Sequence, residues 1–189
     1  MLSSIIQKLV RGRSEIVVQR IFSYLKGSKK IIDIGSGTGD VAYLLQKKGK
    51  KITPVDVGNF HGLRLVKTTI YDGKILPFKN KSFDTALLLM VLHHTTSPEL
   101  VFKEAARVAD ELVIIETSYT SPVNKIFTVI SDAIGNLRLD AFWNSYKIDK
   151  EWREIFKKHG FKIEESRQFK DKNLGIIPFL HILYYLKRK

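Results

Sequence analysis

The feature that most limits the possible folds is a short apolar run that ends in alternating glycines. Residues 30–34 form the run, and Gly35, Gly37 and Gly39 follow it, ahead of a segment with helical spacing of apolar residues. A run that is apolar at nearly every position indicates a buried strand. Glycines directly after it let the backbone turn tightly and let a ligand approach without meeting a Cβ atom. The pattern therefore predicts a strand, a ligand-binding loop and a helix.

Strands and helices are predicted to alternate along the rest of the chain. Buried runs at 51–57, 63–70, 82–90 and 111–116 predict further strands, and a helix is predicted to begin at Ser97, with another capped by Asp149. Two closing strands at 161–169 and 178–186 are expected to pair antiparallel. Strands separated by helices in this way are typical of an open, mostly parallel sheet covered on both faces.

The length of 189 residues favours one α/β domain. Within it we expect N-terminal helices at 1–28, a ligand-binding core at 29–117, a helical insertion or lid at 118–147, and a closing helix with strands at 148–189. The chain has no cysteine, which excludes disulfides, thiolate metal sites and a cysteine nucleophile. No metal site is expected.

The charge balance raises the question of an anionic partner. Lysine and arginine exceed aspartate and glutamate by 32 to 19, a net charge of +13, but the basic residues fall in small groups along the whole chain. No signal peptide or membrane span is predicted, so a cytoplasmic protein is expected. The apolar residues Ile5, Ile6, Leu9 and Val10 form either a short helix on a membrane surface or a helix that packs on the domain.

Acidic residues around the glycine loop distinguish between two classes of cofactor. A dinucleotide would meet Asp40, where its fingerprint requires a small residue, at the helix end that should hold the pyrophosphate. S-adenosylmethionine has no phosphate and carries positive charge, so Asp33 and Asp40 favour it. The second strand ends in Asp56, 21 positions after Gly35, where a carboxylate can accept both hydroxyls of a ribose.

With these motifs the sequence resembles the class I S-adenosylmethionine-dependent methyltransferases of the small-molecule type, methyltransferase type 11. The segment IIDIGSGTGD is similar to their first motif, and the resemblance continues through Asp72-Gly73, a Leu-Pro-Phe segment and Ser-Phe-Asp before the fourth strand. It is close over residues 29–117. It implies a Rossmann-like, three-layer α/β/α sandwich whose mostly parallel, seven-stranded sheet has an antiparallel C-terminal strand.

The resemblance also implies which residues bind the cofactor. Asp72 would accept a hydrogen bond from the adenine amino group, and Met90 and Val91 would lie near the sulfur. Two departures concern the neighbouring loops: the helix after the second strand is shortened to a loop near 58–62, and the Lys-Pro-Gly-Gly turn before the fifth strand is missing. The expected cofactor-binding residues are Asp33, Gly35, Ser36, Gly37, Gly39, Asp56, Val57, Tyr71, Asp72, Gly73, Met90 and Val91.

Two groups of residues are candidates for the chemistry on the acceptor side. His93 and His94 could act as a general base, because histidine titrates near neutral pH, although one of them could equally pack beneath the next helix. Three aromatic residues of the insertion, Tyr119, Trp143 and Tyr146, line a substrate pocket or form the core of a lid.

Three functions remain open at this stage. The first is methyl transfer to a small-molecule or lipid-like acceptor, with contact to an anionic membrane. The second is ribose methylation of RNA, which the positive charge favours; the missing cysteine and the Leu-Leu-Leu-Met end of the fourth strand argue against base methylation. The third is a non-catalytic partner protein with a cofactor fold, which would have no physical need for an open glycine loop.

Overall fold

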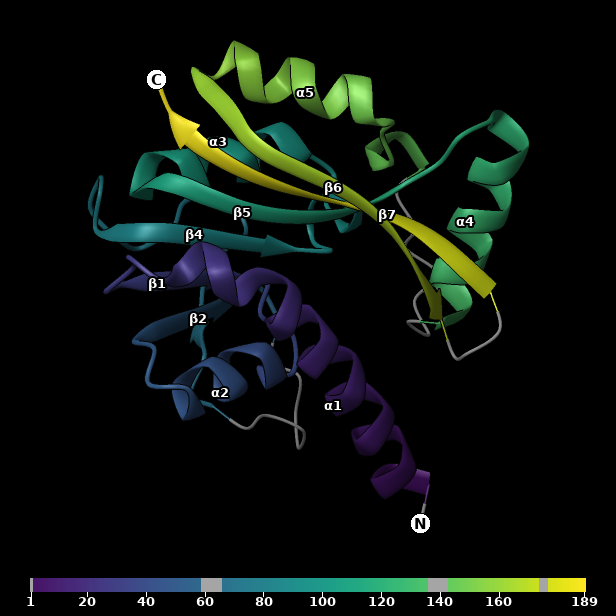
Figure 1. Ribbon diagram of the computed structural model, residues 1–189, viewed down its shortest axis with the longest axis horizontal. Coiled ribbons are helices and arrows are strands. Elements are labelled where there is room, and N and C mark those ends of the chain that lie inside the picture. Colours follow the sequence, from purple (N-terminus) through teal and green to yellow (C-terminus); the bar gives the residue numbers. More distant parts are fainter. Residues whose placement is uncertain (1, 59–65, 136–142, 174–176) are drawn as a thin grey trace.

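A seven-stranded sheet forms the centre of the protein in the computed structural model, which describes residues 2–58, 66–135, 143–173 and 177–189 (Figure 1). The strand order is β3-β2-β1-β4-β5-β7-β6, and among the described strands β7 alone runs in the opposite direction to the others. This confirms the predicted fold. The strands are β1 (Ile31–Ile34), β2 (Ile52–Asp56), β3 (Thr69–Ile70), β4 (Phe83–Leu89), β5 (Ala109–Ser118), β6 (Phe161–Asn173) and β7 (Ile177–Arg188).

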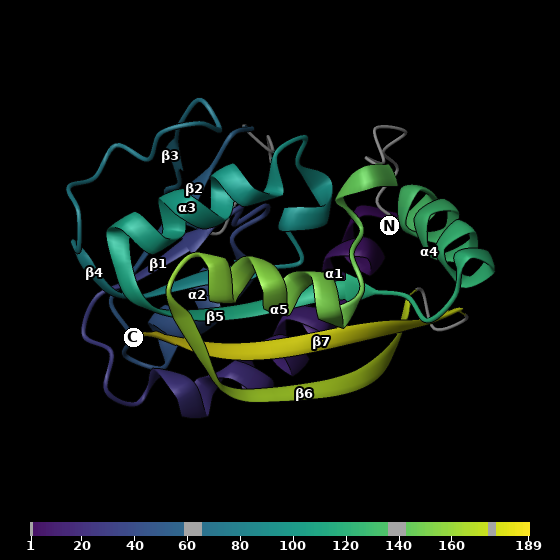
Figure 2. The ribbon, with the colours of Figure 1, turned by 90° about the horizontal axis from the view of Figure 1, so that it is seen from above.

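Helices cover both faces of the sheet and one of its ends. In Figure 1, α1 (Leu2–Ile21) and α2 (Asp40–Lys47) lie below the sheet, and α3 (Pro98–Val108) and α5 (Asp149–Lys158) lie above it. A further helix, α4 (Pro122–Gly135), stands beyond the end at which β5 finishes, and the N-terminal half of α1 points past the same end (Figures 1 and 2). Short 3₁₀ helices are η1 (Phe22–Leu25), η2 (Leu92–His94) and η3 (Trp143–Ser145).

Alternate residues of each central strand contribute to two separate cores. In β5, Leu112 and Ile114 pack beneath α3 and α5, whereas Val113 and Ile115 pack against α1 and α2. This alternation follows from the period of two in a strand, and it explains why these strands are apolar on both faces. The largest buried side chain, Trp152 of α5, completes the upper core.

Some boundaries differ from those predicted. Of the predicted strand at 63–70, only Thr69–Ile70 is a strand within the described residues, and the expected short loop at 58–62 lies almost wholly outside them. β5 extends to Ser118 because β7 pairs with it from Glu111 to Ser118. Asp149 begins α5 and does not cap it: Ile148 holds the cap position, and its N–H donates to Glu151 at 2.8 Å.

The C-terminal half of α1 packs on the sheet. Val17, Val18 and Ile21 of α1 belong to the lower core. Arg20 donates to the Asp171 carboxylate of β6 at 2.7 Å and lies 3.9 Å above the ring of Phe169. Of the helices described, none combines the length and apolar character that crossing a membrane requires.

Candidate active site

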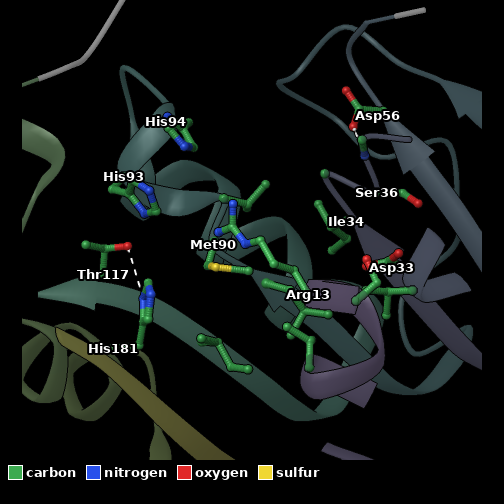
Figure 3. A pocket seen from close by; sticks show the side chains of 18 of the residues that line it. Arg13, Asp33, Ile34, Ser36, Asp56, Met90, His93, His94, Thr117 and His181 are labelled. Atoms are coloured by element: carbon green, nitrogen blue, oxygen red, sulfur yellow. Dashed lines mark hydrogen bonds between the residues drawn. The ribbon is translucent and has the colours of Figure 1, made fainter. Parts of the chain in front are cut away.

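A cavity of about 510 Å³ lies at the carboxyl ends of the parallel strands (Figure 3). The chain reverses its order across the sheet between β1 and β4, and a crevice at that point is where open α/β sheets bind ligands. One end of the cavity, the loop end, is formed by the glycine loop and the end of β2. The other, the hairpin end, is formed by η2, the end of β5 and the β6–β7 hairpin.

The glycine loop is held close to β2 and needs its glycines for two different reasons. The N–H groups of Gly35 and Ser36 both donate to the carbonyl of Val55, at 2.9 and 3.0 Å. Gly35 has a φ of +75°, and a Cβ atom there would lie 1.8 Å from Cγ2 of Val91. Gly37 has a φ of +56°, and no described atom lies within 4 Å of the position that a Cβ atom would take. Gly37 lines the cavity.

Asp33 is a buried carboxyl group that lines the loop end of the cavity. Its side chain is 2% exposed, and its Oδ2 finds no hydrogen-bond partner among the described residues. Burial raises the pKa of Asp33 to about 7, and the nearby Asp56 carboxylate acts in the same direction. A cationic group in the cavity would favour the ionised form, because opposite charge offsets the cost of burial.

Asp56 ends β2 and organises the backbone around it. Its Oδ2 accepts from the Gly37 N–H at 2.7 Å and its Oδ1 from the Gly58 N–H at 3.0 Å. A carboxylate has about four acceptor positions, so both oxygens keep capacity for ligand hydroxyls.

The neighbouring Val57 is exposed and lines the cavity. Tyr71 also lines it, and burial, aided by the Asp56 carboxylate, raises the pKa of its phenol to about 12, so the hydroxyl stays protonated.

The two residues that follow Tyr71, Asp72 and Gly73, do not line the cavity. Asp72 is exposed, and its Oδ1 accepts from the N–H groups of Lys74 and Ile75, at 2.8 and 3.0 Å. These bonds lower the pKa of Asp72. Gly73 has a φ of +78° and packs against Val57. A contact between Asp72 and an adenine remains a prediction.

The end of β4 brings two side chains to the middle of the cavity. Met90 adopts a φ of +58°, which is uncommon for a residue with a side chain, and its N–H donates to the carbonyl of Ile115 at 2.7 Å. Both Met90 and Val91 line the cavity. A costly backbone conformation that the surrounding structure holds in place is typical of a functional site.

His93 and Glu116 form a buried pair at the hairpin end. Glu116 is fully buried, and its carboxylate accepts from the N–H groups of Val91, Leu92 and His93, at 3.0, 2.8 and 3.4 Å. The same carboxylate lies 2.5 Å from Nδ1 of His93. The Glu116 carboxylate can only accept hydrogen bonds, so Nδ1 of His93 must carry a proton and donate to it. In a neutral His93 ring the basic lone pair is therefore on Nε2. His94, half-buried, also lines the cavity.

The hairpin end contains several residues that the sequence analysis did not single out. His181 of β7 is buried, with its Nδ1 3.3 Å from the Thr117 hydroxyl, and burial lowers the pKa of His181 to about 4, so the ring is neutral at neutral pH (Figure 3). Phe169 and Phe179 contribute aromatic walls. A lone histidine within the apolar run of β7 was the only local signal for this part of the site.

The three aromatic residues predicted for the substrate pocket are not among the described residues that line the cavity. Tyr146 is buried behind His93, with the two ring centres 4.9 Å apart. Tyr119 and Trp143 each lie 4.9 Å from the ammonium group of Lys125 on α4. Trp143 is exposed, and a role of these aromatic residues in binding the acceptor remains a prediction.

Comparison with known proteins identifies the class of protein. A family model described as a methyltransferase domain matches residues 7–166, and the chain belongs to this family. S-adenosylmethionine is accordingly its cofactor. The residues present fit it: Asp33 offers a buried carboxylate oxygen without a described partner, and Gly37 leaves space where a Cβ would intrude. No curated protein matches the sequence.

Solved structures share the fold at low sequence identity. An S-adenosylmethionine-dependent methyltransferase from Methanosarcina mazei is 18% identical, with a TM-score of 0.68 over 89% of this chain and 96% of that one. A possible histamine N-methyltransferase from Thermotoga maritima is 19% identical, with a TM-score of 0.68 over 100% and 96%. A putative methyltransferase from Bacillus halodurans is 16% identical, with a TM-score of 0.68 over 90% and 97%.

Proposed function

We propose that this methyltransferase methylates a hydroxyl or phenol oxygen of an apolar, lipid-like acceptor bound at the hairpin end of the cavity. The observation that carries the proposal is the combination of apolar walls, which include Phe169 and Phe179, with the buried His93–Glu116 pair. Apolar walls with a few converging polar groups favour an apolar ligand and fix its orientation. The bound cofactor would supply an electrophilic methyl group on a sulfonium.

In this proposal the loop end holds the cofactor. Asp33 pairs with the cofactor's ammonium group, and Asp56 accepts hydrogen bonds from its ribose hydroxyls. Arg13 of α1 is the only lysine or arginine among the described residues that line the cavity, which makes it the candidate for the cofactor's carboxylate. Gly37 has no side chain, and the space where a Cβ atom would lie is open. The backbone of the loop can therefore approach the ligand closely.

At the hairpin end, this chain's residues align the acceptor and accept its proton. His93 Nε2 takes the proton of the acceptor hydroxyl, and Glu116 holds the ring in orientation through Nδ1. His181 is neutral at neutral pH and therefore adds no positive charge that would oppose protonation of His93. Walls that exclude water support alignment, a contribution worth about 7–11 kcal/mol in favourable cases.

Label transfer from methyl-tritiated S-adenosylmethionine tests the acceptor class. We expect label in the organic phase when the protein is incubated with a total lipid extract, and none in purified RNA. Asp56→Ala is the matched control, because it removes the ribose contacts and should abolish transfer. Label in RNA would contradict the proposal in favour of ribose methylation, and cofactor binding without transfer to either class would favour the non-catalytic alternative.

The pKa of Asp33 makes cofactor binding depend on pH. Only the ionised carboxylate attracts an ammonium group, so the affinity for S-adenosylhomocysteine is expected to rise about tenfold between pH 6 and pH 8 as a group with a pKa of about 7 ionises. The stability of the unliganded protein changes with pH in the opposite direction. Its native state binds the extra proton, so stability falls as the pH rises from about 4 to about 7.

Isothermal titration calorimetry at several pH values measures this effect. Methylthioadenosine, which lacks the amino-acid part, is the matched ligand and should bind with little pH dependence. Asp33→Asn should flatten the pH profile for S-adenosylhomocysteine. An unchanged profile in that variant would show that another group is responsible.

A further inference from the structure

Helix α4 presents an apolar stripe to solvent. Val123, Ile126, Phe127 and Ile130 follow the helical spacing i, i+3, i+4, i+7, and their side chains are 46–64% exposed. On the same helix the polar residues Thr128 and Ser131 are buried. A helix on a soluble domain normally buries the apolar stripe and exposes the polar one. The α4 stripe, defined by these four residues, is therefore turned away from the protein's own core.

The location of α4 relates this stripe to the active site. The helix follows β5 directly, contacts β6, and stands beyond the end of the sheet where the cavity lies (Figures 1 and 2). The N-terminal half of α1 extends past the same end of the molecule. A surface that contacts the stripe would therefore be close to the strand ends that form the cavity.

The charge of the surroundings favours an anionic partner. The chain carries a net charge of +13. Exposed basic side chains occur on the elements around α4: Lys170 on β6 and Lys150 at the start of α5. Apolar side chains on a helix combined with basic residues nearby are typical of segments that lie in the interface of an anionic bilayer.

A second copy of the chain fits this surface less well. The four side chains expose on the order of 400 Å², taking about 150–200 Å² for each large apolar side chain. Each partner of a stable protein interface buries about 800 Å², twice that area. Two copies would in addition bring together molecules that each carry +13. Insertion into a bilayer requires no matching protein surface.

We infer that α4 docks this protein on anionic membranes, with Val123, Ile126, Phe127 and Ile130 inserted among the lipids and the basic residues close to the headgroups. The inference goes beyond the proposed reaction and does not depend on the acceptor. Membrane contact through α4 brings the cavity to the bilayer surface, where an apolar acceptor is concentrated.

Co-sedimentation with vesicles tests this surface. We expect the protein to bind vesicles of phosphatidylcholine with phosphatidylglycerol, and to bind those of phosphatidylcholine alone more weakly. The double variant Phe127→Ser with Ile130→Ser should bind the anionic vesicles at least about tenfold more weakly, because it removes two apolar side chains from the lipid. Ile75→Ser is the matched control: Ile75 is 68% exposed but lies in the connection between β3 and β4, away from α4.

The other outcomes overturn the inference. Wild-type protein that stays in the supernatant with anionic vesicles, or a double variant that binds as well as wild type, excludes α4 as the docking surface. A concentration-dependent dimer in sedimentation velocity that the double variant loses would assign the stripe to a second copy. Phe127→Ser alone serves as a milder variant, and unchanged affinity for S-adenosylhomocysteine verifies the fold of each, so failure here is distinct from failure of the proposed reaction.

Discussion

Replacing His93 by glutamine is expected to lower kcat for methyl transfer to a hydroxyl acceptor by about 10²–10⁴-fold, the usual contribution of a general base. His93 is 1% exposed and lines the cavity, and its Nδ1 lies 2.5 Å from the Glu116 carboxylate. Glutamine keeps a polar group of similar size but cannot accept a proton. Cofactor binding should change little, because the loop end of the cavity is untouched.

Steady-state kinetics on the acceptor found by label transfer measures this loss, and calorimetry with S-adenosylhomocysteine verifies the cofactor site. His94→Gln is the matched control, since it is the neighbouring histidine on η2 and also lines the cavity. If His94→Gln loses turnover while His93→Gln retains it, the base is the other histidine. If neither loses it, the acceptor needs no base.

Glu116 acts in this scheme as a positioning residue. Its carboxylate binds three consecutive backbone N–H groups of the turn that leads into η2, as well as the His93 ring. The same side chain therefore stabilises the turn and selects the tautomer of the histidine. The sequence shows only an acid at the end of a buried strand, and nothing local connects it to a histidine 23 positions earlier.

The part of the site that the sequence predicts well is the part built by parallel strands. Buried runs identify β1, β2, β4 and β5, and the carboxyl ends of parallel strands meet at one edge of a sheet. The cavity accordingly contains Asp33, Asp56 and Met90 together. Their spacing along the chain suffices to place them, because each position lies near the carboxyl end of a parallel strand.

The remainder of the site depends on long-range packing that leaves little local signal. Arg13 reaches the cavity because α1 packs across the lower face of the sheet, and Phe169 and His181 reach it because the β6–β7 hairpin pairs with β5. Asp72 differs for a local reason. Its carboxylate is satisfied by the backbone of its own turn, a contact that aspartate forms readily and that a motif comparison does not reveal.

Gly37→Ala and Gly35→Ala are expected to separate the two roles of the glycine loop. At Gly37 the added methyl group meets no described atom, so the loss of stability is limited to about 1–2 kcal/mol for a residue at positive φ. The methyl group would instead occupy ligand space and disturb the N–H that donates to Asp56. The affinity for S-adenosylhomocysteine should fall on the order of 100-fold, which corresponds to about 3 kcal/mol.

At Gly35 the expected loss is in stability. The added Cβ would lie 1.8 Å from Cγ2 of Val91, so the free energy of unfolding should fall by about 2–4 kcal/mol from overpacking and backbone strain combined. Val91→Ala removes that carbon atom and leaves Cβ at 3.1 Å, so the double variant should recover part of the loss. Urea unfolding of the four proteins measures this coupling between neighbours. Additive losses would contradict the contact, whereas an unchanged affinity for S-adenosylhomocysteine in Gly37→Ala would mean that the cofactor does not approach the loop at Gly37.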